Sequence, residues 1–373
     1  MRYINEFIDQ KLRERATSLS LRTLSSNRNL IDFCSNDYLG FSRSEKLKSS
    51  IENQLQQTPS YSIGSTGSRL ISGNDDFTEI LESEIALFHN AKAALIFNSG
   101  YDANLGLFSS LPQRGDTVIL DEFIHASIID GARLSYANRY TFRHNDLNSL
   151  EEKLKLAKGR IFIGIESIYS MDGDAAPLQD IILLAEKHSA AVIVDEAHAV
   201  GIFGKNGRGL VEHYNLTDRV FARIVTFGKA LGCHGAAVLC EENLRHFLIN
   251  FARSFIFTTA TSFYAHLSIK MAYKHLLETE TSIIHNKVEL FKKETQSIRE
   301  LFVRSISPIQ CLVVTGNEDA KELASTLQRK SFDVRAILHP TVPLGKERLR
   351  ICLHSFNTDI EIRNLAQTLV ENI

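Results

Sequence analysis

The sequence contains little cysteine, no excess of charge of either sign and no long apolar run, and each shortage excludes a class of protein. The five cysteines are an odd number, are scattered and include no C-x-x-C pair. A disulfide framework or a structural zinc site is therefore not expected, and a reducing cytoplasm fits best. The cysteines are Cys34, Cys233, Cys240, Cys311 and Cys352.

The net charge is −2 and the pI about 6.7, so no basic field indicates nucleic acid or an acidic membrane as a partner. No stretch approaches the roughly 18 consecutive apolar residues that would indicate a membrane span. The first 15 residues lack the apolar core of a signal peptide and are too acidic for a transit peptide. They predict instead an amphipathic helix, with Ile4, Phe7, Ile8 and Leu12 on one face.

What is present is the alternation of short apolar runs with helical patterns, in a chain of 373 residues that is long enough for two domains. Such alternation predicts an α/β fold with a mostly parallel central sheet and helices on both faces. Two of the predicted helices are Leu150–Ala157 and Leu178–His188. The predicted strands are Ala94–Asn98, Thr117–Leu120, Ile161–Glu166, Ala191–Asp195, Arg223–Phe227 and Ala236–Cys240.

The character of the sequence changes from about Ser282 onward. A long helical pattern over 282–304 precedes short predicted strands near 309–315 and 348–353, which is typical of a smaller α+β domain. We therefore predict an N-terminal helix and arm over 1–40, a large domain over 41–280 and a small C-terminal domain over 281–373.

An open parallel sheet binds its ligand beyond the carboxyl ends of its strands, so the residues after each predicted strand are the candidates for a site. Lys229 lies there in T-F-G-K-A-L-G, where small neighbours leave room for a bulky group on its amine. Burial would lower the pKa of such a lysine and free it for Schiff-base chemistry. The alternative is an exposed lysine in a turn.

Asp195 ends the strand A-A-V-I-V-D, where a carboxylate can pair with a protonated pyridine nitrogen or simply cap a helix. His198 could reach a ring oxygen or a substrate carboxylate. His125 could stack on a flat ring, or cap a helix. Ser99-Gly100-Tyr101 offers backbone N–H groups to a phosphate, although a plain strand-to-helix turn has the same pattern.

The hydroxyls of Ser170 and Thr226 mean little singly, but strand ends together carry a lysine, an acid, a ring-stacker, hydroxyls and a phosphate nest. That set matches the needs of a phosphorylated aldehyde cofactor, pyridoxal 5'-phosphate.

The chain resembles the α-oxoamine synthases, pyridoxal-phosphate enzymes of fold type I that condense an amino acid with an acyl thioester and release CO2. The resemblance runs from about Ser35 to the C-terminus and rests on an ordered set of short motifs. They are S-N-D-Y-L-G (35–40), G-S-T-G-S-R-L-I-S-G (64–73), N-S-G-Y (98–101), H-A-S-I (125–128), S-M-D-G-D-A-A-P-L (170–178), D-E-A-H (195–198), T-F-G-K-A-L-G (226–232), F-I-F-T-T (255–259), P-T-V-P (340–343) and R-L-R (348–350).

The resemblance implies a role for each matching residue. Lys229 would hold the cofactor as a Schiff base, Asp195 would pair with the pyridine nitrogen and His125 would stack on the ring. Ser170 and His198 would approach the ring hydroxyl, and Gly100, Tyr101 and Thr226 would hold the phosphate. Thr258 or Thr259 would reach the phosphate of a partner chain, since family sites lie at a homodimer interface. Arg350, Thr341 and Asn36 would contact the substrate.

Within the family, the chain is most similar to members of biotin synthesis that join L-alanine to a pimeloyl thioester. Arg22, in Leu21-Arg22, matches an arginine that binds the acyl chain in such members. The chain departs from the family at Ala260–Phe263, where a Pro-Pro is common, and at Thr78, where histidine is common. Two alternatives stay open: a sibling that uses glycine or serine, and a partner subunit without catalytic function.

Overall fold

The computed structural model describes residues 2–24, 29–58 and 60–373, and the chain forms two compact units. The larger unit is built from Asn36–Tyr169 and Ala175–Ser282, and the smaller from Met1–Ser35, Ser170–Asp174 and Ile283–Ile373. The predicted domain boundaries near residues 40 and 280 stay predictions. Each unit has its own sheet.

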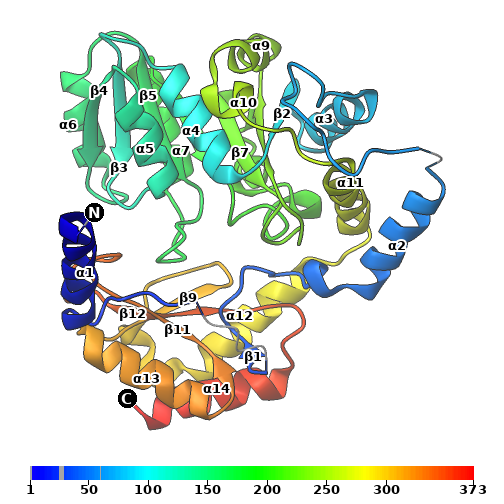
Figure 1. The fold of residues 1–373 in the computed structure, drawn as a ribbon. Coiled ribbons are helices and arrows are strands. Elements are labelled where there is room, and N and C mark those ends of the chain that lie inside the picture. The colour runs from blue at the N-terminus through cyan, green and yellow to red at the C-terminus, as the bar shows by residue number, and fades with distance from the viewer. Residues whose placement is uncertain (1, 25–28, 59) are drawn as a thin grey trace. The chain divides into compact units, whose positions relative to one another are not determined.

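A seven-stranded sheet with the order β2-β8-β7-β6-β5-β3-β4 forms the centre of the larger unit (Figure 1). Neighbouring strands from β7 through β6, β5 and β3 to β4 are parallel, while β8 runs antiparallel to both β2 and β7. The strands are β2 (Ala93–Phe97), β3 (Thr117–Asp121), β4 (Asn138–Phe142), β5 (Ile161–Glu166), β6 (Ala191–Asp195), β7 (Ala222–Thr226) and β8 (Ala236–Cys240).

The predicted mostly parallel sheet is thus confirmed, and its six predicted strands match the observed ones to within a residue at each end. The sequence prediction missed β4, because this strand lies at the edge of the sheet. Four of its five side chains are exposed or only half-buried, so it has no continuous apolar run.

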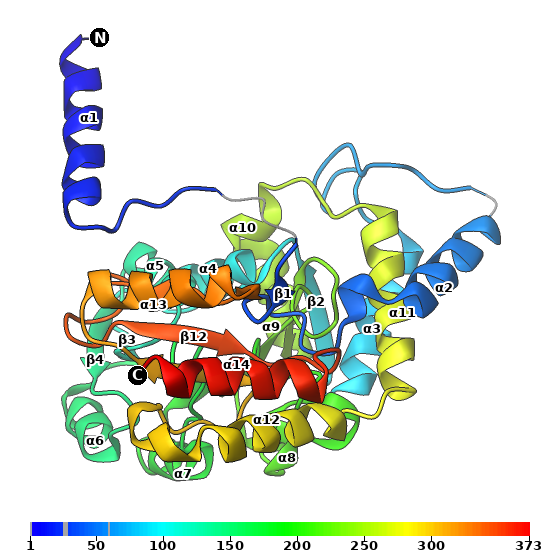
Figure 2. The same ribbon diagram turned by 90° about the horizontal axis from the view of Figure 1, so that it is seen from below.

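Helices cover both faces of this sheet. Helices α4 (Gly100–Ser110) and α5 (Ala126–Leu134) pack together on one side, while α6 (Leu147–Leu156) and α7 (Leu178–Lys187) pack on the other (Figure 2). The prediction placed the start of α6 three residues too late, because Asp146 caps its N-terminus and accepts a hydrogen bond from the Ser149 N–H. The remaining helices of four or more residues in this unit are α2 (Glu45–Gln56), α3 (Asp76–Phe88), α8 (Leu210–His213), α9 (Glu242–Phe251), α10 (Arg253–Ile256) and α11 (Phe263–Leu277).

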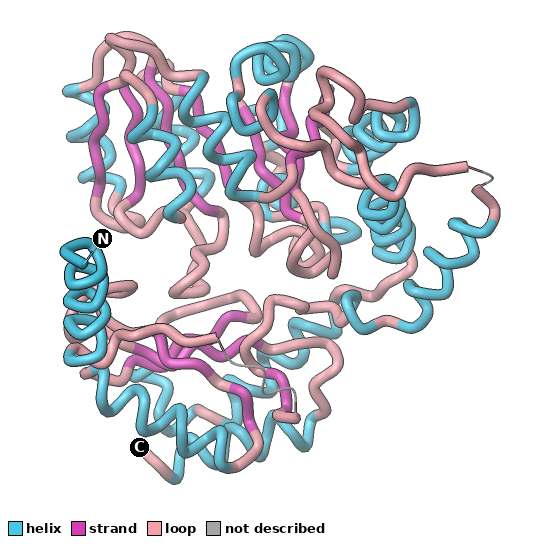
Figure 3. Tube along the Cα trace, in the orientation of Figure 1, coloured by secondary structure: helices cyan, strands magenta, loops and turns pink. Residues whose placement is uncertain are grey.

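Buried apolar side chains from the sheet, α4, α5, α9 and α10 form one continuous core. Leu107, Phe108 and Ile128, on the two packed helices, are completely buried there. This core holds the strands rigidly, and the loops that follow the strands extend from one end of the unit (Figure 3).

The smaller unit contains an antiparallel sheet with the order β11-β12-β9 and a two-stranded parallel pairing of β1 with β10. Helix α13 packs against β11, β12 and α14. The predicted short strands near 309–315 and 348–353 are confirmed. The elements are α1 (Arg2–Thr17), β1 (Ile31–Asp32), α12 (Ser282–Glu294), β9 (Ile309–Val313), α13 (Asn317–Arg329), β10 (Phe332–Asp333), β11 (Arg335–Ile337), β12 (Arg348–Cys352) and α14 (Asp359–Glu371).

The prediction of one long helical stretch over 282–304 was wrong. Helix α12 ends at Glu294, and a 3-10 segment follows over Gln296–Leu301 with non-helical backbone at Ile298. Thr295 is buried, and its hydroxyl donates to the Phe291 carbonyl. A side chain that bonds back to the preceding turn in this way competes with continued helix.

None of the five cysteines forms a disulfide, and three of them are buried. The pKa values of four are raised to about 12, and burial is the largest cause at each of them: Cys34, Cys233, Cys240 and Cys311.

Candidate active site

A cavity of about 240 Å³ lies at the carboxyl ends of the parallel strands in the larger unit. The structure brings six predicted site residues together around it: Gly100, Tyr101, His125, Asp195, Thr226 and Lys229. The cavity therefore lies where the topology of an open parallel sheet predicts a ligand.

Lys229 follows β7 in a tight turn. The Cys233 N–H donates to the Phe227 carbonyl (2.7 Å), and the Gly232 N–H donates to the Lys229 carbonyl (2.8 Å). The lysine is half-buried, and its Nζ lies 2.8 Å from His198 Nε2. The alternative of an exposed turn lysine is therefore wrong.

The Asp195 carboxylate is buried and held from two sides. Its Oδ1 accepts the Ala197 N–H (2.9 Å), and its Oδ2 accepts Asn104 Nδ2 (2.7 Å). These bonds fix the carboxylate where it lines the cavity, which is what pairing with a ring nitrogen would require.

His125 begins α5 as its N-cap. Its Nδ1 accepts the Ser127 N–H (3.2 Å) and lies 2.7 Å from Ser127 Oγ, so the capping alternative is part of the structure. Burial lowers the pKa of His125. Asp195 opposes that shift, and Lys229 adds to it. The ring as a whole stays exposed, so capping leaves it available for stacking.

The N-terminus of α4 fits a phosphate group. Ser99 caps the helix by accepting the Asp102 N–H, and the backbone of Gly100 and Tyr101 lines the cavity beside Thr226. Thr226 Oγ1 is buried and has no hydrogen-bond partner among the described residues. A Cβ atom on Gly100 would come within 2.7 Å of Thr226 Cγ2, so only glycine leaves this corner open. An unpaired hydroxyl beside a helix N-terminus is suited to an anion.

The side chain of Tyr101 has a different partner. Its hydroxyl donates to Asp130, and the side chain is largely exposed. Only the backbone of Tyr101 is therefore suited to the phosphate.

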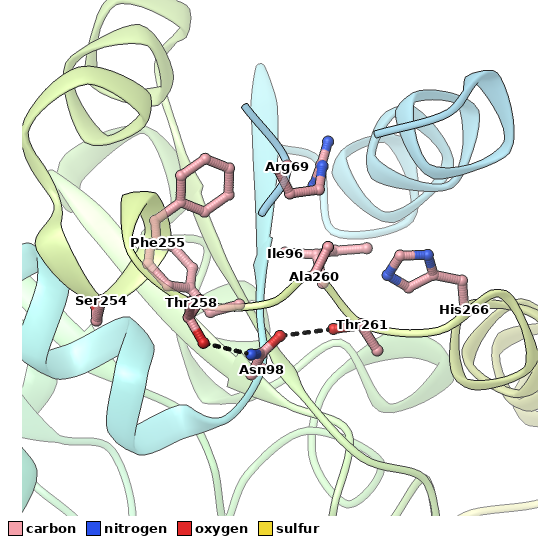
Figure 4. A pocket seen from close by; sticks show the side chains of 10 residues that line it. Arg69, Ile96, Asn98, Ser254, Phe255, Thr258, Ala260, Thr261 and His266 are labelled. Carbon is pink, nitrogen blue, oxygen red and sulfur yellow. Dashed lines mark hydrogen bonds between the residues drawn. The ribbon is translucent and has the colours of Figure 1, made fainter. Parts of the chain in front are cut away.

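Thr258 and Thr259 lie near a second, much smaller cavity of the larger unit, which Figure 4 shows. Asn98 Nδ2 donates to Thr258 Oγ1 (3.0 Å) and to the Thr259 carbonyl (2.8 Å). Thr261 Oγ1 donates to Asn98 Oδ1 (2.9 Å), so the Asn98 amide ties this segment to the end of β2. Contact of either threonine with a partner chain's phosphate stays a prediction.

Arg350 and Ser170 belong to the smaller unit, where they contact each other. Arg350 is buried on β12, and its Nε donates to the Ser170 carbonyl (2.7 Å). Its Nη1 lies 2.9 Å from Cys352 Sγ. Arg348, on the same strand, forms a buried ion pair with Asp172. The segment that carries Ser170 is thus attached to this sheet.

Two predicted substrate residues of the smaller unit also meet, although they are far apart in sequence. Arg22 Nη2 donates to Thr341 Oγ1 (3.0 Å), and both side chains are exposed. Asn36 lies in the larger unit, where its Oδ1 accepts the Tyr38 hydroxyl (3.1 Å).

The structure adds site residues that were not predicted. Asn104, Glu166 and His234 line the large cavity, and Tyr38 contacts His198. Asn104 had a usable signal, since it lies one helical turn after Gly100 and so shares its face of α4. Glu166 is the last residue of a predicted strand. Tyr38 lies in the motif S-N-D-Y-L-G, but the sequence does not show its contact with His198, which is 160 residues away.

Among the described residues, no cluster of three or more histidine, cysteine or acidic side chains could hold a metal ion. No helix in the described part of the chain is long and apolar enough to span a membrane.

Comparison with known proteins defines the class. The family model for aminotransferase class I and II matches residues 28–369, and the chain belongs to this family. Among curated relatives, the 8-amino-7-oxononanoate synthase of Emericella nidulans is 41% identical over 98% of this chain and 95% of its own length. The 8-amino-7-oxononanoate synthase of Saccharophagus degradans is 36% identical over 99% of this chain and 93% of its own length.

Solved structures agree with this placement. The 8-amino-7-oxononanoate synthase of Francisella tularensis has a TM-score of 0.79 and 30% identity, covering 92% of this chain and 98% of its own. Serine palmitoyltransferase of Sphingomonas wittichii has a TM-score of 0.88 and 26% identity, covering 99% and 97%. The predicted resemblance to the α-oxoamine synthases and the fold type I architecture are confirmed.

The cofactor of this family is pyridoxal phosphate, as predicted, and a neighbour with a TM-score of 0.86 was solved with it as an internal aldimine. The cavity of the larger unit offers the groups that this cofactor needs. They are the amine of Lys229, the fixed carboxylate of Asp195, the ring of His125, and the N-terminus of α4 beside the Thr226 hydroxyl, which has no partner among the described residues.

Proposed function

We propose that the chain condenses L-alanine with a pimeloyl thioester to give 8-amino-7-oxononanoate, CO2 and a free thiol, as an acyltransferase of biotin synthesis. The observation that carries the proposal is the near full-length identity of 33–41% to relatives named 8-amino-7-oxononanoate synthase. The cavity that holds Lys229, Asp195 and His125 supports it chemically.

The residues of the larger unit would bind the cofactor and activate the amino acid substrate. When bound, the cofactor withdraws electrons from the substrate Cα. Lys229 would anchor it and then remove the Cα proton, because its amine stays beside that carbon after displacement. Asp195 would keep the ring nitrogen protonated, since the two bonds to its carboxylate prevent it from turning away. Gly100 and Thr226 would hold the phosphate.

The residues of the smaller unit would select the substrates. Arg350 would bind the alanine carboxylate as a bidentate pair, which suits a guanidinium that is already buried and oriented. Arg22, steadied by Thr341, would pair with the distal carboxylate of the acyl chain. Ser170 of this unit and His198 of the larger unit would approach the ring hydroxyl, and Asn36, also of the larger unit, would contact the substrate.

Assembly and location belong to the same proposal. We infer a cytoplasmic homodimer in which Thr258 or Thr259 reaches the cofactor phosphate of the partner chain. The exposure of Thr259 and the tethering of its carbonyl by Asn98 support this role, since a residue that serves a partner must be both accessible and fixed.

A second candidate is a serine palmitoyltransferase type of activity. Neighbours with that name reach TM-scores of 0.86–0.88, although at only 26% identity. Both activities share the same cofactor chemistry and differ in the amino acid and in the acyl chain.

The deciding experiment is a substrate panel with CO2 release as readout. Alanine, glycine and serine are each combined with pimeloyl and palmitoyl thioesters, on coenzyme A and on acyl-carrier protein. We expect alanine with a pimeloyl thioester to give the highest kcat/KM. Preference for serine with palmitoyl thioester would replace the first proposal by the second, and absence of CO2 release from every pair would indicate a subunit without catalytic function.

A further inference from the structure

A buried row of hydrogen bonds runs from Lys229 back to the segment before α2. His198 Nε2 lies 2.8 Å from Lys229 Nζ, and His198 Nδ1 lies 2.8 Å from the Tyr38 hydroxyl. The Tyr38 hydroxyl in turn donates to Asn36 Oδ1 at 3.1 Å. Tyr38 is completely buried and His198 is 3% exposed, so the row is shielded from water at its centre. None of the roles described above uses Tyr38.

The hydrogen bonds of this row indicate where the Tyr38 hydroxyl proton and the His198 ring proton lie. A phenol has one proton, and Tyr38 gives its proton to Asn36 Oδ1, which can only accept. The phenol oxygen must then accept from His198 Nδ1–H. A neutral imidazole carries a single N–H, so the nitrogen that faces Lys229 Nζ presents a lone pair.

A lone pair at that place has a use, because a lysine amine can attack an aldehyde only after it has lost its proton. We propose that Tyr38 is a positioning residue that, together with Asn36, holds the His198 ring with its Nε2 lone pair toward Lys229, so that His198 takes the proton that Lys229 must lose before it binds the cofactor. The inference rests on the proposed role of Lys229 as the anchor.

The step balances. A proton moves from Lys229 Nζ to His198 Nε2, which leaves a neutral amine and an imidazolium whose Nδ1–H is still bonded to Tyr38. The neutral amine would then form the C–N bond to the aldehyde carbon of a bound cofactor, and the aldehyde oxygen would leave as water with the two remaining protons of the amine.

Other titratable groups face the same cavity but do not duplicate this geometry. Asp195, at the end of β6, and Glu166, at the end of β5, are carboxylates that stabilise positive charge on either Lys229 or His198. His125 and His234 also line the cavity. His198 Nε2 lies within hydrogen-bonding distance of Lys229 Nζ, at 2.8 Å.

The test measures reconstitution instead of turnover. The cofactor is removed from the purified enzyme, pyridoxal phosphate is added back, and the growth of visible absorption is followed by stopped flow from pH 6 to pH 9. In Tyr38→Phe, His198 Nδ1–H loses its acceptor, so the ring favours the tautomer with a proton toward Lys229. We expect the rate constant at pH 7 to fall at least about tenfold and the pH profile to move upward, while the final absorbance is unchanged.

The matched control is Tyr273→Phe. Tyr273 is a second buried tyrosine of the larger unit, and its hydroxyl lies 2.9 Å from Nε2 of the buried His89. This variant also loses a tyrosine–histidine hydrogen bond, but one that includes neither His198 nor Lys229. It should reconstitute at the wild-type rate. A wild-type rate and pH profile in Tyr38→Phe would overturn the proposal, as would equal slowing in both variants.

Two further measurements distinguish failure of the role proposed for Tyr38 from failure of the role proposed for Lys229. If Tyr38→Phe does not fold, nitrogen NMR of the labelled wild-type protein without cofactor decides, with the signal assigned by His198→Gln: a proton on Nδ1 supports the proposal and a proton on Nε2 overturns it. Borohydride reduction followed by peptide mapping tests the anchor. Cofactor attached to a residue other than Lys229 would remove the proposed function of that lysine, whatever the rate of Tyr38→Phe.

Discussion

The two units hold their chemically important side chains in opposite ways. In the larger unit, Asp195 ends a strand and Lys229 lies in the turn that follows one, so both are carried by chain that is leaving the sheet. In the smaller unit, Arg350 lies inside β12, where Cys311 of β9 and Arg335 of β11 flank it in the ladder. The comparison shows that the cavity residues of the larger unit lie at a strand end and in a turn, whereas Arg350 is held within the register of a strand.

The two units are alike in one respect, because each has a buried ion pair close in sequence to these groups. Glu196, next to Asp195, is completely buried and faces the buried Arg223 at 3.7 Å. Burial raises the pKa of Glu196, and the charge of Arg223 opposes the shift. In the smaller unit, Arg348 and Asp172 form a comparable buried pair two residues from Arg350 on β12.

The largest effect is expected for Lys229→Ala. If the turn after β7 carries the reactive amine, the variant loses both covalent cofactor binding and the base, and CO2 release should fall by at least about 10³-fold. The matched control is Lys187→Ala, an exposed lysine at the end of α7, which should behave as wild type. Near-normal turnover in Lys229→Ala would remove the functional contrast between the units.

The next effect concerns the support beneath Asp195. Glu196→Ala leaves Arg223 buried without its carboxylate, and the free energy of unfolding should fall by about 3–5 kcal/mol. Urea unfolding followed by circular dichroism measures it. The control is Glu186→Ala, which breaks an exposed pair with Arg219 and should change the midpoint little. Equal midpoints for both variants would mean that the buried pair does not stabilise this region.

For the smaller unit we expect a binding effect. Arg350→Lys keeps the positive charge but loses the two parallel N–H donors of the guanidinium. KM for alanine should therefore rise roughly tenfold to a hundredfold, corresponding to about 1.5–3 kcal/mol, while KM for the thioester should change little. Arg363→Lys, on the exposed side of α14, is the control. A matching rise for both substrates would show that Arg350 supports the sheet and does not select the amino acid.

A fourth prediction concerns the pH dependence of stability in the larger unit. Burial lowers the pKa of His266, in the larger unit, to about 4, and the charge of Arg69 acts in the same direction. Below pH 6.5 this histidine is therefore protonated in the unfolded chain but stays neutral in the folded chain until the pH approaches 4. Its contribution to the free energy of unfolding is complete above pH 6.5 and is lost as the pH falls toward 4.

Between pH 7 and pH 5 this histidine should cost about 2 kcal/mol of unfolding free energy. Urea unfolding at both pH values should show a smaller difference for His266→Gln than for wild type. The control is the exposed His246→Gln, which should retain the wild-type difference. An unchanged difference in His266→Gln would assign the acid sensitivity elsewhere.

The smallest effect is expected at Arg22. Because this arginine is exposed and bonds only Thr341 among the described contacts, Arg22→Ala should reduce the preference for a pimeloyl thioester over a neutral chain of similar length by about tenfold. A competition assay between the two thioesters measures the preference. If wild type shows no preference for the pimeloyl thioester, then Arg22 does not bind the distal carboxylate, and the assignment of a biotin-pathway substrate is wrong.

Much of the larger unit was predictable, because its strands are buried on both faces and so appear as unbroken apolar runs. The same rule located Asp195 and Lys229, since topology places ligands after such runs. It failed for β4, most of whose side chains are exposed or half-buried, and for Tyr38, which lies in the motif S-N-D-Y-L-G but whose contact with His198 arises only in the fold.

The smaller unit was harder to predict for a physical reason. Arg350 lies in mid-strand between apolar neighbours, and an arginine there has no position that marks it as functional. Only the resemblance of R-L-R to a family motif singled it out. The break after α12 was likewise hidden, because the apolar spacing continues past Glu294 while the Thr295 hydroxyl competes locally for the helix carbonyls.

The raised pKa values of the thiols have a practical consequence for handling. With a pKa of about 12 at Cys34, Cys233, Cys240 and Cys311, only a fraction on the order of 10⁻⁵ of each is thiolate at pH 7. Alkylating agents and dissolved oxygen react with the thiolate, so these side chains should resist both. These four thiols therefore need no added thiol reductant in reconstitution buffers, where a reductant that reacts with aldehydes would compete with Lys229 for the cofactor.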